Sequence, residues 1–336
     1  MIKEAIKQLV AGKSLVVEQA EQLMQEIMDG EATPAQFGAF VTALRLKGET
    51  ADELIGMARV MRAKSVKVNV EQAVIDTCGT GGDAAGTFNI STGAALVAAG
   101  AGLGVAKHGN RAMSSRCGSA DVLEALGVKI DCDAAGVERC IREAGIGFMF
   151  APLFHPAMKC AAAPRREIGI RTVFNLIGPL TNPAGAQAQV IGVAEGAIAE
   201  KIALTLKGLG CRHALVVHGE RGIDEIAVSG RTHICELRDG EIKNYDINPA
   251  DFGLTEAGAD SVKGGDAVEN AGILRDVLSG NITGPRRDVV LMNAAAALLA
   301  GDKVEDLRKG YELAAEVIDG GQAAAKLEKL VEMSNR

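Results

Sequence analysis

A glycine-rich stretch near residue 80 carries the residue types that bind phosphate. An apolar lead-in at 73–75 runs into GTGGD over Gly79–Asp83, and after a short loop NIST over Asn89–Thr92 opens a run of small and apolar residues. Glycines let a backbone turn tightly and approach a ligand closely. The unpaired N–H groups and positive dipole end of a helix start favour an anion. The pattern therefore predicts a phosphate cradle, although it is neither a Walker loop nor GxGxxG.

Two cations follow in the next motif. The sequence KHGNR over Lys107–Arg111 comes after a second short apolar stretch, and SSR over 114–116 follows it. Cations beside a glycine favour phosphate binding over the alternative of simple surface charges. Asp83 would repel phosphate, so we expect it to bind a ribose hydroxyl or a backbone N–H. Two such loops after successive strands predict a ligand with phosphate at both ends.

An acidic pair, Asp224-Glu225, follows the apolar run Ala214–Val217 and the tripeptide 218–220. Adjacent carboxylates repel each other unless a cation joins them. Magnesium prefers hard oxygen ligands and substrate phosphates, so it is the cation that we expect beside phosphate loops. The alternative, a solvated surface pair, is the usual reading of an isolated Asp-Glu. The two upstream loops favour the metal.

The motifs GTGGD, NIST and KHGNR, in this order and at this spacing, resemble those of the anthranilate phosphoribosyltransferase family. These enzymes join anthranilate to phosphoribosyl pyrophosphate in tryptophan synthesis, and the resemblance runs over nearly the whole chain. It implies an α/β fold in which a small N-terminal α-helical domain accompanies a large domain with a mostly parallel central sheet, as in nucleoside phosphorylases. It also implies magnesium (Mg²⁺) as cofactor, with two ions, and a homodimer formed through the helical domain.

The resemblance implies which residues hold phosphoribosyl pyrophosphate. The chain departs from the family pattern at Ala112, Met113 and Cys117, which would change side-chain contacts there and not backbone contacts. Lys107 would stabilise the negative charge that develops on the leaving pyrophosphate. Ser119 would also cap a helix. The contacting residues are Gly79, Gly82, Asp83, Thr87, Asn89, Ile90, Ser91, Thr92, Lys107, His108, Gly109, Asn110, Arg111, Ala112, Met113, Ser114, Ser115 and Ser119.

The same resemblance implies a metal site and an acceptor site. A neutral hydroxyl beside acids and pyrophosphate oxygens suits magnesium, and the family's metal ligands correspond to Ser91, Asp224 and Glu225. The acceptor carboxylate requires a guanidinium or amide donors, and the anthranilate-binding residues correspond to Gly79, Asn110 and Arg165. The anthranilate amine is a weak base that is neutral at physiological pH, so no residue is assigned as acid or base.

Composition narrows the class of protein. The 336 residues are 48% apolar, 24% charged and 3% aromatic, which indicates an ample core and room for two domains. The net charge of −7 counts against nucleic acid as a partner. Seven scattered cysteines without CxxC spacing indicate small buried hydrophobes in a reducing compartment. With no signal-peptide core and no membrane-length apolar run, we expect a cytoplasmic protein without a membrane partner.

The elements that must position these motifs can be predicted from periodicity and caps. Residues 1–65 are expected to be helical throughout, with capping boxes at Thr33–Gln36 and Thr50–Glu53, and 66–70 is expected to be a hinge. From residue 73 strands and helices alternate, which implies a largely parallel sheet whose carboxyl-end loops gather at one edge. We expect strands near 73–77, 103–107, 147–150, 188–193, 213–218 and 226–228. We expect helices near 91–101, 119–126, 134–144, 156–161, 197–208, 266–278, 286–300, 303–318 and 320–332.

Two further segments complete the predicted organisation. Residues 167–180 are helix-like, and the resemblance implies that this part of the chain returns to the helical domain. We therefore expect a helical domain of 1–70 completed by 166–182, and an α/β domain of 71–165 and 183–336. Arg231–Asp246, with Asp239-Gly240 at its centre, is expected to be a β-hairpin that only decorates the surface.

Two alternatives to a phosphoribosyltransferase are left open by the sequence. A pyrimidine nucleoside phosphorylase resembles it in architecture but uses inorganic phosphate and needs no acidic metal pair, so Asp224-Glu225 argues against it. A non-catalytic relative that binds nucleic acid would need a basic surface and would tolerate loss of the metal acids. The net charge and the intact motifs disfavour that alternative.

Overall fold

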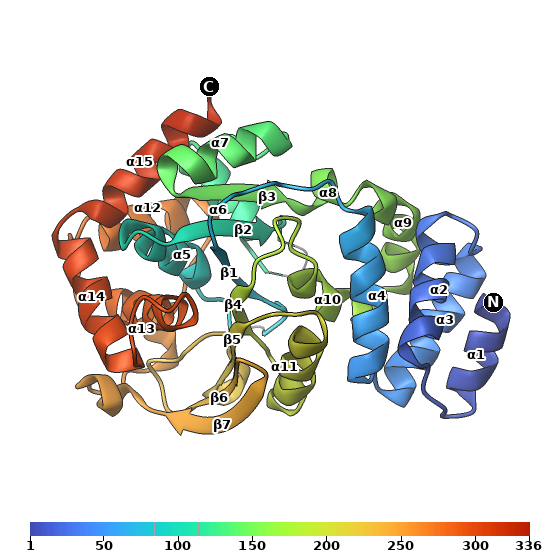
Figure 1. Cartoon of the computed structure of the whole chain (residues 1–336). Helices are drawn as coiled ribbons and strands as arrows, with labels where there is room; N and C mark the ends of the chain where they lie inside the picture. The colour runs from blue at the N-terminus through green and yellow to red at the C-terminus, as the bar shows by residue number, and fades with distance from the viewer. Residues whose placement is uncertain (84, 113–114) are drawn as a thin grey trace.

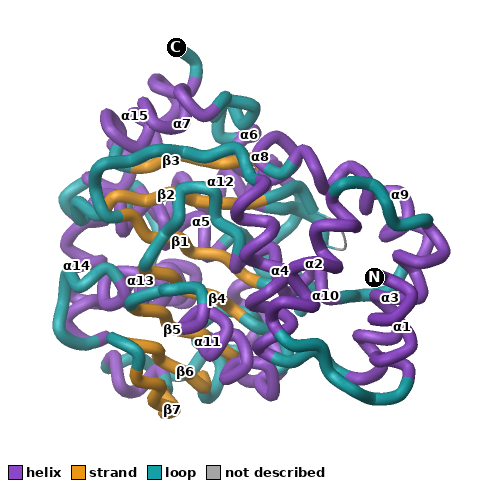
Figure 2. The backbone as a smooth tube through the Cα atoms, turned by 45° about the vertical axis from the view of Figure 1, so that its right-hand side comes forward, coloured by secondary structure: helices purple, strands orange, loops and turns teal. Residues whose placement is uncertain are grey.

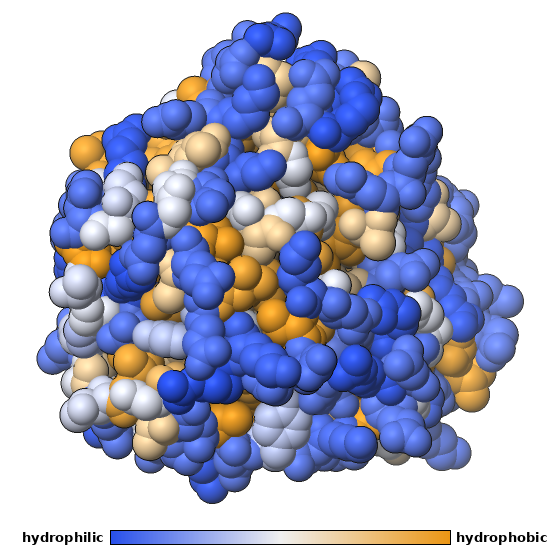
Figure 3. Space-filling view, turned by 60° about the vertical axis from the view of Figure 1, so that its left-hand side comes forward, coloured by the Kyte–Doolittle hydropathy of each residue, from blue (hydrophilic) through white to orange (hydrophobic). Residues whose placement is uncertain are grey.

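The computed structural model of the chain describes residues 1–83, 85–112 and 115–336 (Figure 1). The expectations for Met113 and Ser114 therefore lie outside the described residues. None of the helices within these ranges combines the length and the apolar character needed to cross a membrane. The face shown in Figure 3 is mainly hydrophilic, with hydrophobic residues in smaller areas between polar ones.

Four helices open the chain, as the sequence predicts. They are α1 (Ile2–Val10), α2 (Val17–Met28), α3 (Pro34–Lys47) and α4 (Ala51–Lys64). Both predicted capping boxes are confirmed, because Thr33 Oγ1 accepts from the Gln36 N–H and Thr50 Oγ1 accepts from the Glu53 N–H. Each such cap stabilises its helix by about 1 kcal/mol. The four helices pack as a bundle beside the sheet (Figure 1).

A seven-stranded sheet forms the centre of the larger part of the molecule. Its order in space is β3-β2-β1-β4-β5-β6-β7; the strands from β3 to β5 are parallel, and β6 and β7 are antiparallel to their neighbours. The strand order reverses between β1 and β4, which is where open α/β sheets bind their ligands. The strands are β1 (Val74–Gly79), β2 (Gly104–Gly109), β3 (Ile146–Phe150), β4 (Ala188–Gly192), β5 (His213–Gly219), β6 (Thr232–Arg238) and β7 (Glu241–Ile247).

Helices cover both faces of the sheet, because alternate residues along each strand point to opposite faces. Val190 packs on the first face and its neighbour Ile191 on the second. The second face packs against α11 (Ala199–Gly208) and, through the same hydrophobic cluster, against the N-terminal helices. The first face packs against α5 (Ile90–Gly100), α13 (Pro285–Ala300) and α15 (Gln322–Ser334). In the same hydrophobic cluster, α12 (Ala267–Leu278) and α14 (Leu307–Asp319) pack on these helices. Two further helices complete these layers. α6 (Ser119–Ala125) packs on α12, and α7 (Ala134–Ala144) packs on β3 and α15.

Three helices after β3 carry the chain back to the N-terminal bundle (Figure 2). α8 (Ala151–Phe154) leads to α9 (Lys159–Ile168), which packs on α2 and α3, and α10 (Val173–Ile177) packs on α3 and α4. The prediction of one helix-like stretch at 167–180 is wrong. Gly169 takes a left-handed φ of 68° and ends α9, and α10 begins separately at Val173. The helix expected at 156–161 is a short 3-10 turn followed by α9.

The strand expected at 226–228 is wrong. The backbone of Ile226 is bonded to the Asn293 side chain of α13, and the Ala227 N–H donates to Thr232 Oγ1 at 3.0 Å. All three residues of the segment are buried. An apolar run therefore resembles a strand here because it is buried, while the Asn293 and Thr232 side chains and the Ala257 N–H, rather than a neighbouring strand, bond to its backbone.

The predicted hairpin is confirmed, but the expectation that it decorates the surface is wrong. Asp239 and Gly240 turn with φ of 49° and 83°, the positive values that a tight hairpin turn requires. All seven residues of β6 pair with β5, and Ile234, Cys235 and Leu237 on β6 are fully buried. The hairpin therefore extends the central sheet by two strands.

Candidate active site

Four of the parallel strands end in a glycine at the same edge of the sheet. These are Gly79 of β1, Gly109 of β2, Gly192 of β4 and Gly219 of β5. A Cβ on Gly79 would overlap the Asp224 carboxylate, and one on Gly192 would overlap the Asp224 carbonyl. The glycines therefore let the loop after β5 pass directly over the ends of β1 and β4. This arrangement places Asp224 where the strand order reverses.

The acidic pair Asp224-Glu225 is held by backbone N–H groups of the predicted phosphate cradle. Asp224 Oδ2 accepts from the Gly81 N–H at 2.9 Å, and Glu225 Oε1 accepts from the Ser91 N–H at 3.2 Å. Burial, reinforced by the charge of Asp83, raises the pKa of Asp224 to about 7. Burial and the charge of Asp224 raise the pKa of Glu225 above its ordinary value. Carboxylates that repel each other at one place favour a cation between them.

Lys107 of β2 reaches across to β1 and to the start of α5. It is nearly fully buried, with 2% of its surface exposed. Its Nζ donates to the Thr77 carbonyl at 2.5 Å and to Ser91 Oγ at 3.4 Å. Burial lowers the pKa of Lys107, and the charge of the buried Asp76 opposes this shift. The ammonium group is thereby fixed beside the first turn of α5.

Ser91 joins this cation to the acids. Its N–H donates to Glu225, and its Oγ accepts from Lys107. Among the described residues, no group of three or more His, Cys, Asp and Glu side chains is spaced to hold a metal ion alone. Magnesium at phosphate sites commonly takes one or two carboxylates and completes its shell with phosphate oxygens and water. Asp224 and Glu225 would provide the carboxylates of such a site, and Ser91, whose N–H is bonded to Glu225, carries a hydroxyl.

The glycine loop has the conformation that its composition suggests. Gly81 and Gly82 have φ of 66° and 74°, which side chains disfavour. Asp83 Oδ1 accepts from the Ala85 N–H at 3.2 Å, while its Oδ2 has no partner among the residues that the structure describes. Thr87, further along the loop, forms an isolated bridge with Lys263.

The side chains at the start of α5 are mostly engaged inside the protein. Ile90 and Thr92 are each 1% exposed, so a ligand at this helix start would meet their backbone N–H groups and not their side chains. The Asn89 amide accepts from Asn270 Nδ2 at 3.0 Å and donates to the Cys117 carbonyl at 3.3 Å. Ser91 differs from these residues because its N–H donates to Glu225 and its side chain accepts from Lys107.

The structure does not bring Arg111 to Lys107. The Arg111 guanidinium pairs with Asp121 at 2.9 Å and with Glu124 at 2.8 Å on α6. Asn110 Oδ1 accepts from the Arg111 N–H at 2.8 Å. As a phosphate ligand Arg111 would have to exchange these ion pairs for the substrate.

Ser119 does not cap α6, and that prediction is wrong. The capping residue is Gly118, and Ser119 is the first helical residue, with its Oγ donating to the Asn110 carbonyl at 3.4 Å. A Cβ on Gly109 would overlap Ser119 Oγ, so the end of β2 and the start of α6 are in direct contact. The intervening Ala112 is partly buried, and Ser115 is exposed.

The predicted acceptor residue Arg165 lies on α9, toward the N-terminal bundle. Its guanidinium lies over the Phe174 ring at 5.3 Å, and that ring stacks on Phe37 of α3 at 5.4 Å. On the sheet side, the His108 and His155 rings are 5.1 Å apart. Burial lowers the pKa of His108 to about 3 and that of His155 to about 4. Both rings are therefore neutral at physiological pH, which suits a pocket wall and not a cationic group.

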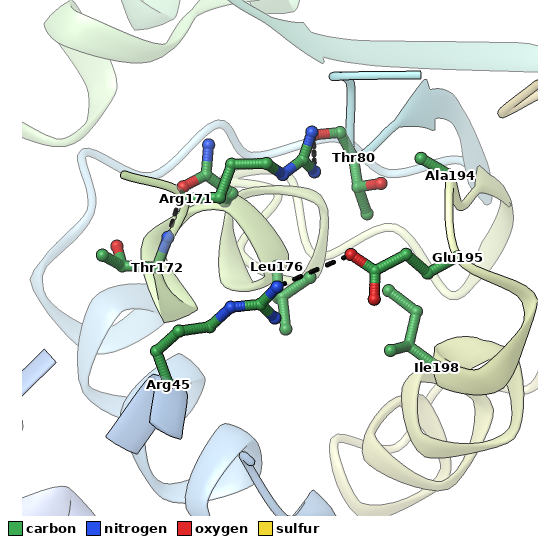
Figure 4. A pocket seen from close by; sticks show the side chains of 9 residues that line it. Arg45, Thr80, Arg171, Thr172, Leu176, Ala194, Glu195 and Ile198 are labelled. Atoms are coloured by element: carbon green, nitrogen blue, oxygen red, sulfur yellow. Dashed lines mark hydrogen bonds and ion pairs between the residues drawn. The ribbon is translucent and has the colours of Figure 1, made fainter. Parts of the chain in front are cut away.

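Two residues that hold the predicted loops were missed by sequence reasoning. Asn293 Oδ1 accepts from the Ile226 N–H at 2.9 Å, and its Nδ2 donates to the Ile226 carbonyl at 3.0 Å, directly after the acidic pair. Arg171, which lies beside Thr80 in Figure 4, donates to the Thr80 carbonyl at 3.4 Å and to the Gly81 carbonyl at 2.5 Å. Asn293 could have been found from the sequence, because it is the single polar residue in the otherwise apolar run 289–300. No sequence pattern marks Arg171.

The carboxyl of Asp76, below the site, makes stability depend on pH. It is fully buried and accepts from the His108 N–H at 3.2 Å and from Asn182 Nδ2 at 2.8 Å. Burial raises its pKa from 3.8 to about 6, although Lys107 opposes the shift. The folded protein therefore keeps a proton that the unfolded chain has released, so the free energy of unfolding decreases as pH rises from about 4 to about 6.

Asp76→Asn is expected to flatten this dependence. The pKa shift corresponds to a change of at most about 3 kcal/mol in the free energy of unfolding across the window. Urea unfolding at several pH values measures it, with the exposed Asp131→Asn as a control that keeps the wild-type slope. An Asp76→Asn variant that retains the full slope would contradict the assignment.

Comparison with known proteins agrees with this architecture over the whole chain. Residues 71–324 match a family described as glycosyl transferase family, a/b domain, and residues 3–65 match the helical bundle domain of that family. Anthranilate phosphoribosyltransferase of Dehalococcoides mccartyi is 58% identical over 336 residues, which cover 99% of this chain and 98% of that protein. The protein of the same name from Chloroflexus aurantiacus is 59% identical over 334 residues, with 99% and 98% covered.

Solved structures give the same result. The crystal structure of anthranilate phosphoribosyltransferase from Thermus thermophilus superimposes with a TM-score of 0.94 at 43% identity and covers 99% of both chains. The Saccharomyces cerevisiae enzyme in complex with phosphoribosyl pyrophosphate (PRPP) and Mg has a TM-score of 0.92 at 28% identity. The match covers 99% of this chain and 98% of that one. The same yeast enzyme in complex with 4-fluoroanthranilate has a TM-score of 0.90 at 27% identity, with 99% and 97% covered. The sequence identity, the two matched domains and the shared fold show that this chain belongs to the anthranilate phosphoribosyltransferase family.

Proposed function

We propose that this chain transfers the phosphoribosyl group of 5-phosphoribosyl 1-pyrophosphate to the amine of anthranilate. The products are N-(5-phosphoribosyl)anthranilate and pyrophosphate, and the reaction belongs to tryptophan biosynthesis. The observation that carries this proposal is the meeting of the glycine loop, Lys107 and the acidic pair over β1 and β4. Relatives named for this activity match nearly the full chain, which supports the assignment.

The donor site would combine backbone N–H groups with charged side chains. The glycine loop and the first turn of α5 would bind the phosphate groups, and Ser91, Asp224 and Glu225 would hold magnesium, with two ions expected. The raised pKa values of the two acids support this role, because a cation relieves their repulsion. When bound, magnesium supplies positive charge that neutralises pyrophosphate as it leaves.

Breaking the bond between ribose C1 and pyrophosphate develops positive charge on the ribose and negative charge on the leaving group. Lys107 is fixed by Thr77 and Ser91 before the reaction begins, so its charge stabilises the leaving group without reorganisation. The anthranilate amine offers a free electron pair at physiological pH, forms the new bond to C1 and then loses its proton to water. The reaction therefore needs no protein base.

Asn293→Leu is expected to raise the magnesium concentration needed for half-maximal activity about tenfold, because the Ile226 backbone next to the acids would lose both partners. The buried polar groups left unpaired would also lower the free energy of unfolding by about 1–3 kcal/mol. Magnesium titration of the activity and urea unfolding measure the two effects. Leu298→Ala, further along α13, serves as a control for lost stability alone. Wild-type magnesium dependence in Asn293→Leu would contradict its positioning role.

The acceptor would enter between the two domains. Arg165 would bind the anthranilate carboxylate from the helical side, with Asn110 and the Gly79 backbone on the other. We expect the helical domain, 1–70 with 166–182, to close on 71–165 and 183–336 about the linker at 66–70. Positioning of two reactants can supply about 7–11 kcal/mol, and closure would exclude competing water.

A cytoplasmic homodimer formed through the helical domain completes the proposal. Three exposed apolar residues of that domain, Val10, Val16 and Leu46, would be available to such an interface. The nucleoside phosphorylase alternative is not favoured, because that reaction uses inorganic phosphate and needs no acidic pair to bind a metal. The nucleic-acid-binding alternative is not favoured by a net charge of −7.

Turnover tests this function directly. The intrinsic fluorescence of anthranilate is expected to disappear when phosphoribosyl pyrophosphate is added with magnesium, and to persist when the metal is chelated. Replacing the donor with inorganic phosphate and a pyrimidine nucleoside tests the alternative reaction. Unchanged anthranilate fluorescence with well-folded protein, both substrates and magnesium would contradict the proposal.

A further inference from the structure

Arg171 is bonded to carbonyl groups of the glycine loop, whereas the acidic pair is bonded to an N–H of the same loop. Its Nη1 donates to the Gly81 carbonyl at 2.5 Å. Its Nη2 donates to the Thr80 carbonyl at 3.4 Å, and Figure 4 shows Arg171 beside Thr80. The N–H of Gly81 meanwhile donates to Asp224 Oδ2 at 2.9 Å. Both backbone polar groups of Gly81 are therefore bonded to side chains, and those side chains come from different parts of the chain.

The next glycine provides the space that Arg171 occupies. A Cβ on Gly82 would overlap Arg171 Nη1, so a side chain at position 82 and the guanidinium in its present place exclude each other. A loop with consecutive glycines has more backbone freedom to lose on ordering than other loops. The rigid fork of a guanidinium suits two successive carbonyl groups better than the single charge of lysine does. Arg171 thus limits the freedom of the loop before any ligand binds.

Arg171 lies on the same segment of the chain as Arg165, the residue proposed to bind the acceptor. It lies between α9, which carries Arg165, and α10, which packs on α3 and α4. The pocket that it lines also includes Arg45 of α3 and Glu195 after β4, whose side chains pair at 3.6 Å (Figure 4). The segment that carries the acceptor arginine is therefore bonded to the donor loop at the junction of the two domains.

We propose that Arg171 is a positioning residue that couples the binding of phosphoribosyl pyrophosphate to the binding of anthranilate. This inference rests on the proposed function. Arg171 acts through the backbone of Thr80 and Gly81 and touches no reacting atom. Its bonds to the two carbonyls do not depend on Asp224, so they persist when Asp224 exchanges the Gly81 N–H for a metal ion. Ordering of the donor loop is then transmitted to the segment that carries Arg165.

Three variants test the coupling. Arg171→Met removes both bonds and keeps an apolar stem, whereas Arg171→Lys keeps the charge and reaches one carbonyl. Arg166→Met, at an exposed position on α9, removes the same charge from the same segment. Calorimetry with phosphoribosyl pyrophosphate and magnesium, without acceptor, gives the donor dissociation constant. Fluorescence assays give kcat and both KM values, with the KM for anthranilate determined at several donor concentrations.

The donor dissociation constant and donor KM of Arg171→Met are expected to rise about tenfold, with a smaller change in kcat. In the wild type the KM for anthranilate should fall as the donor concentration rises, and in Arg171→Met it should stay constant. Arg171→Lys should recover part of the loss, and Arg166→Met should match the wild type. The melting temperatures of all variants should agree within about 3 °C.

Wild-type donor affinity in Arg171→Met would overturn the inference, and so would an equal loss in Arg166→Met or a loss confined to the melting temperature. If Arg171→Met is poorly folded, Arg171→Lys decides the matter, because wild-type donor affinity and wild-type dependence of the anthranilate KM on donor in that variant would also overturn it. Absence of turnover in the wild-type protein would instead overturn the proposed function, so the two failures are distinct.

Discussion

Replacing Asp224 and Glu225 together with alanine is expected to abolish magnesium-dependent turnover, by at least about 10³-fold, while the fold stays intact. The pair provides the two carboxylates of the loop after β5 that are bonded to the glycine loop and to the first turn of α5, and the substitution removes both. Burial raises the pKa of both groups, which means that their ionised forms destabilise the folded protein. Alanine carries no charge and removes this destabilisation. The double variant should therefore melt at or above the wild-type temperature.

A matched control removes the same net charge elsewhere. Glu328→Ala with Glu332→Ala affects two exposed acids on α15 and should leave turnover unchanged. Activity assays across a magnesium series and thermal melting by circular dichroism measure both variants. Full activity in the Asp224/Glu225 variant would remove the metal assignment, whereas an unfolded variant would show that the pair has a structural role.

Lys107→Met is expected to lower kcat/KM for phosphoribosyl pyrophosphate about 10²–10³-fold, because a fixed positive charge beside Ser91 would be lost. The substitution also leaves the buried Asp76 without its cation. Replacing one partner of a buried charge pair usually destabilises, whereas replacing both with neutral groups of similar size is often tolerated. The double variant Lys107→Met with Asp76→Asn should thus regain stability and remain inactive.

This pair of variants separates folding from catalysis. Urea unfolding should show the loss in the single variant and its recovery in the double variant, and the fluorescence assay should show no recovery of rate. Recovery of activity along with stability would contradict the assigned role of Lys107, because it would mean that the lysine serves only to neutralise Asp76.

The sequence predicted the parts of the site that depend on local pattern and on parallel topology. Gly81 and Asp224 are 143 residues apart, and their contact was foreseeable because the carboxyl ends of parallel strands share one edge. The capping boxes at Thr33 and Thr50 were foreseeable because each is complete within four residues. The family resemblance added the individual site residues, which topology alone does not select.

The features that escaped prediction depend on partners far away in the sequence. The Arg111 guanidinium pairs with acids on α6, and a spacing pattern cannot rank those partners against a phosphate. The run 226–228 is as apolar as a buried strand, although it pairs with no strand within the described part of the chain and an amide from α13 is bonded to the backbone of Ile226. Arg171 has no local pattern at all, since its partners are carbonyl groups and not side chains.

The position of the donor is the central claim, and crystals grown with phosphoribosyl pyrophosphate and Mn²⁺ in place of magnesium test it most directly. Anomalous scattering is expected to place manganese against the carboxylates of Asp224 and Glu225, with pyrophosphate density between Lys107 and the first turn of α5. Ordered donor at another surface, with Gly79–Asp83 and the acidic pair in contact with solvent only, would contradict the account.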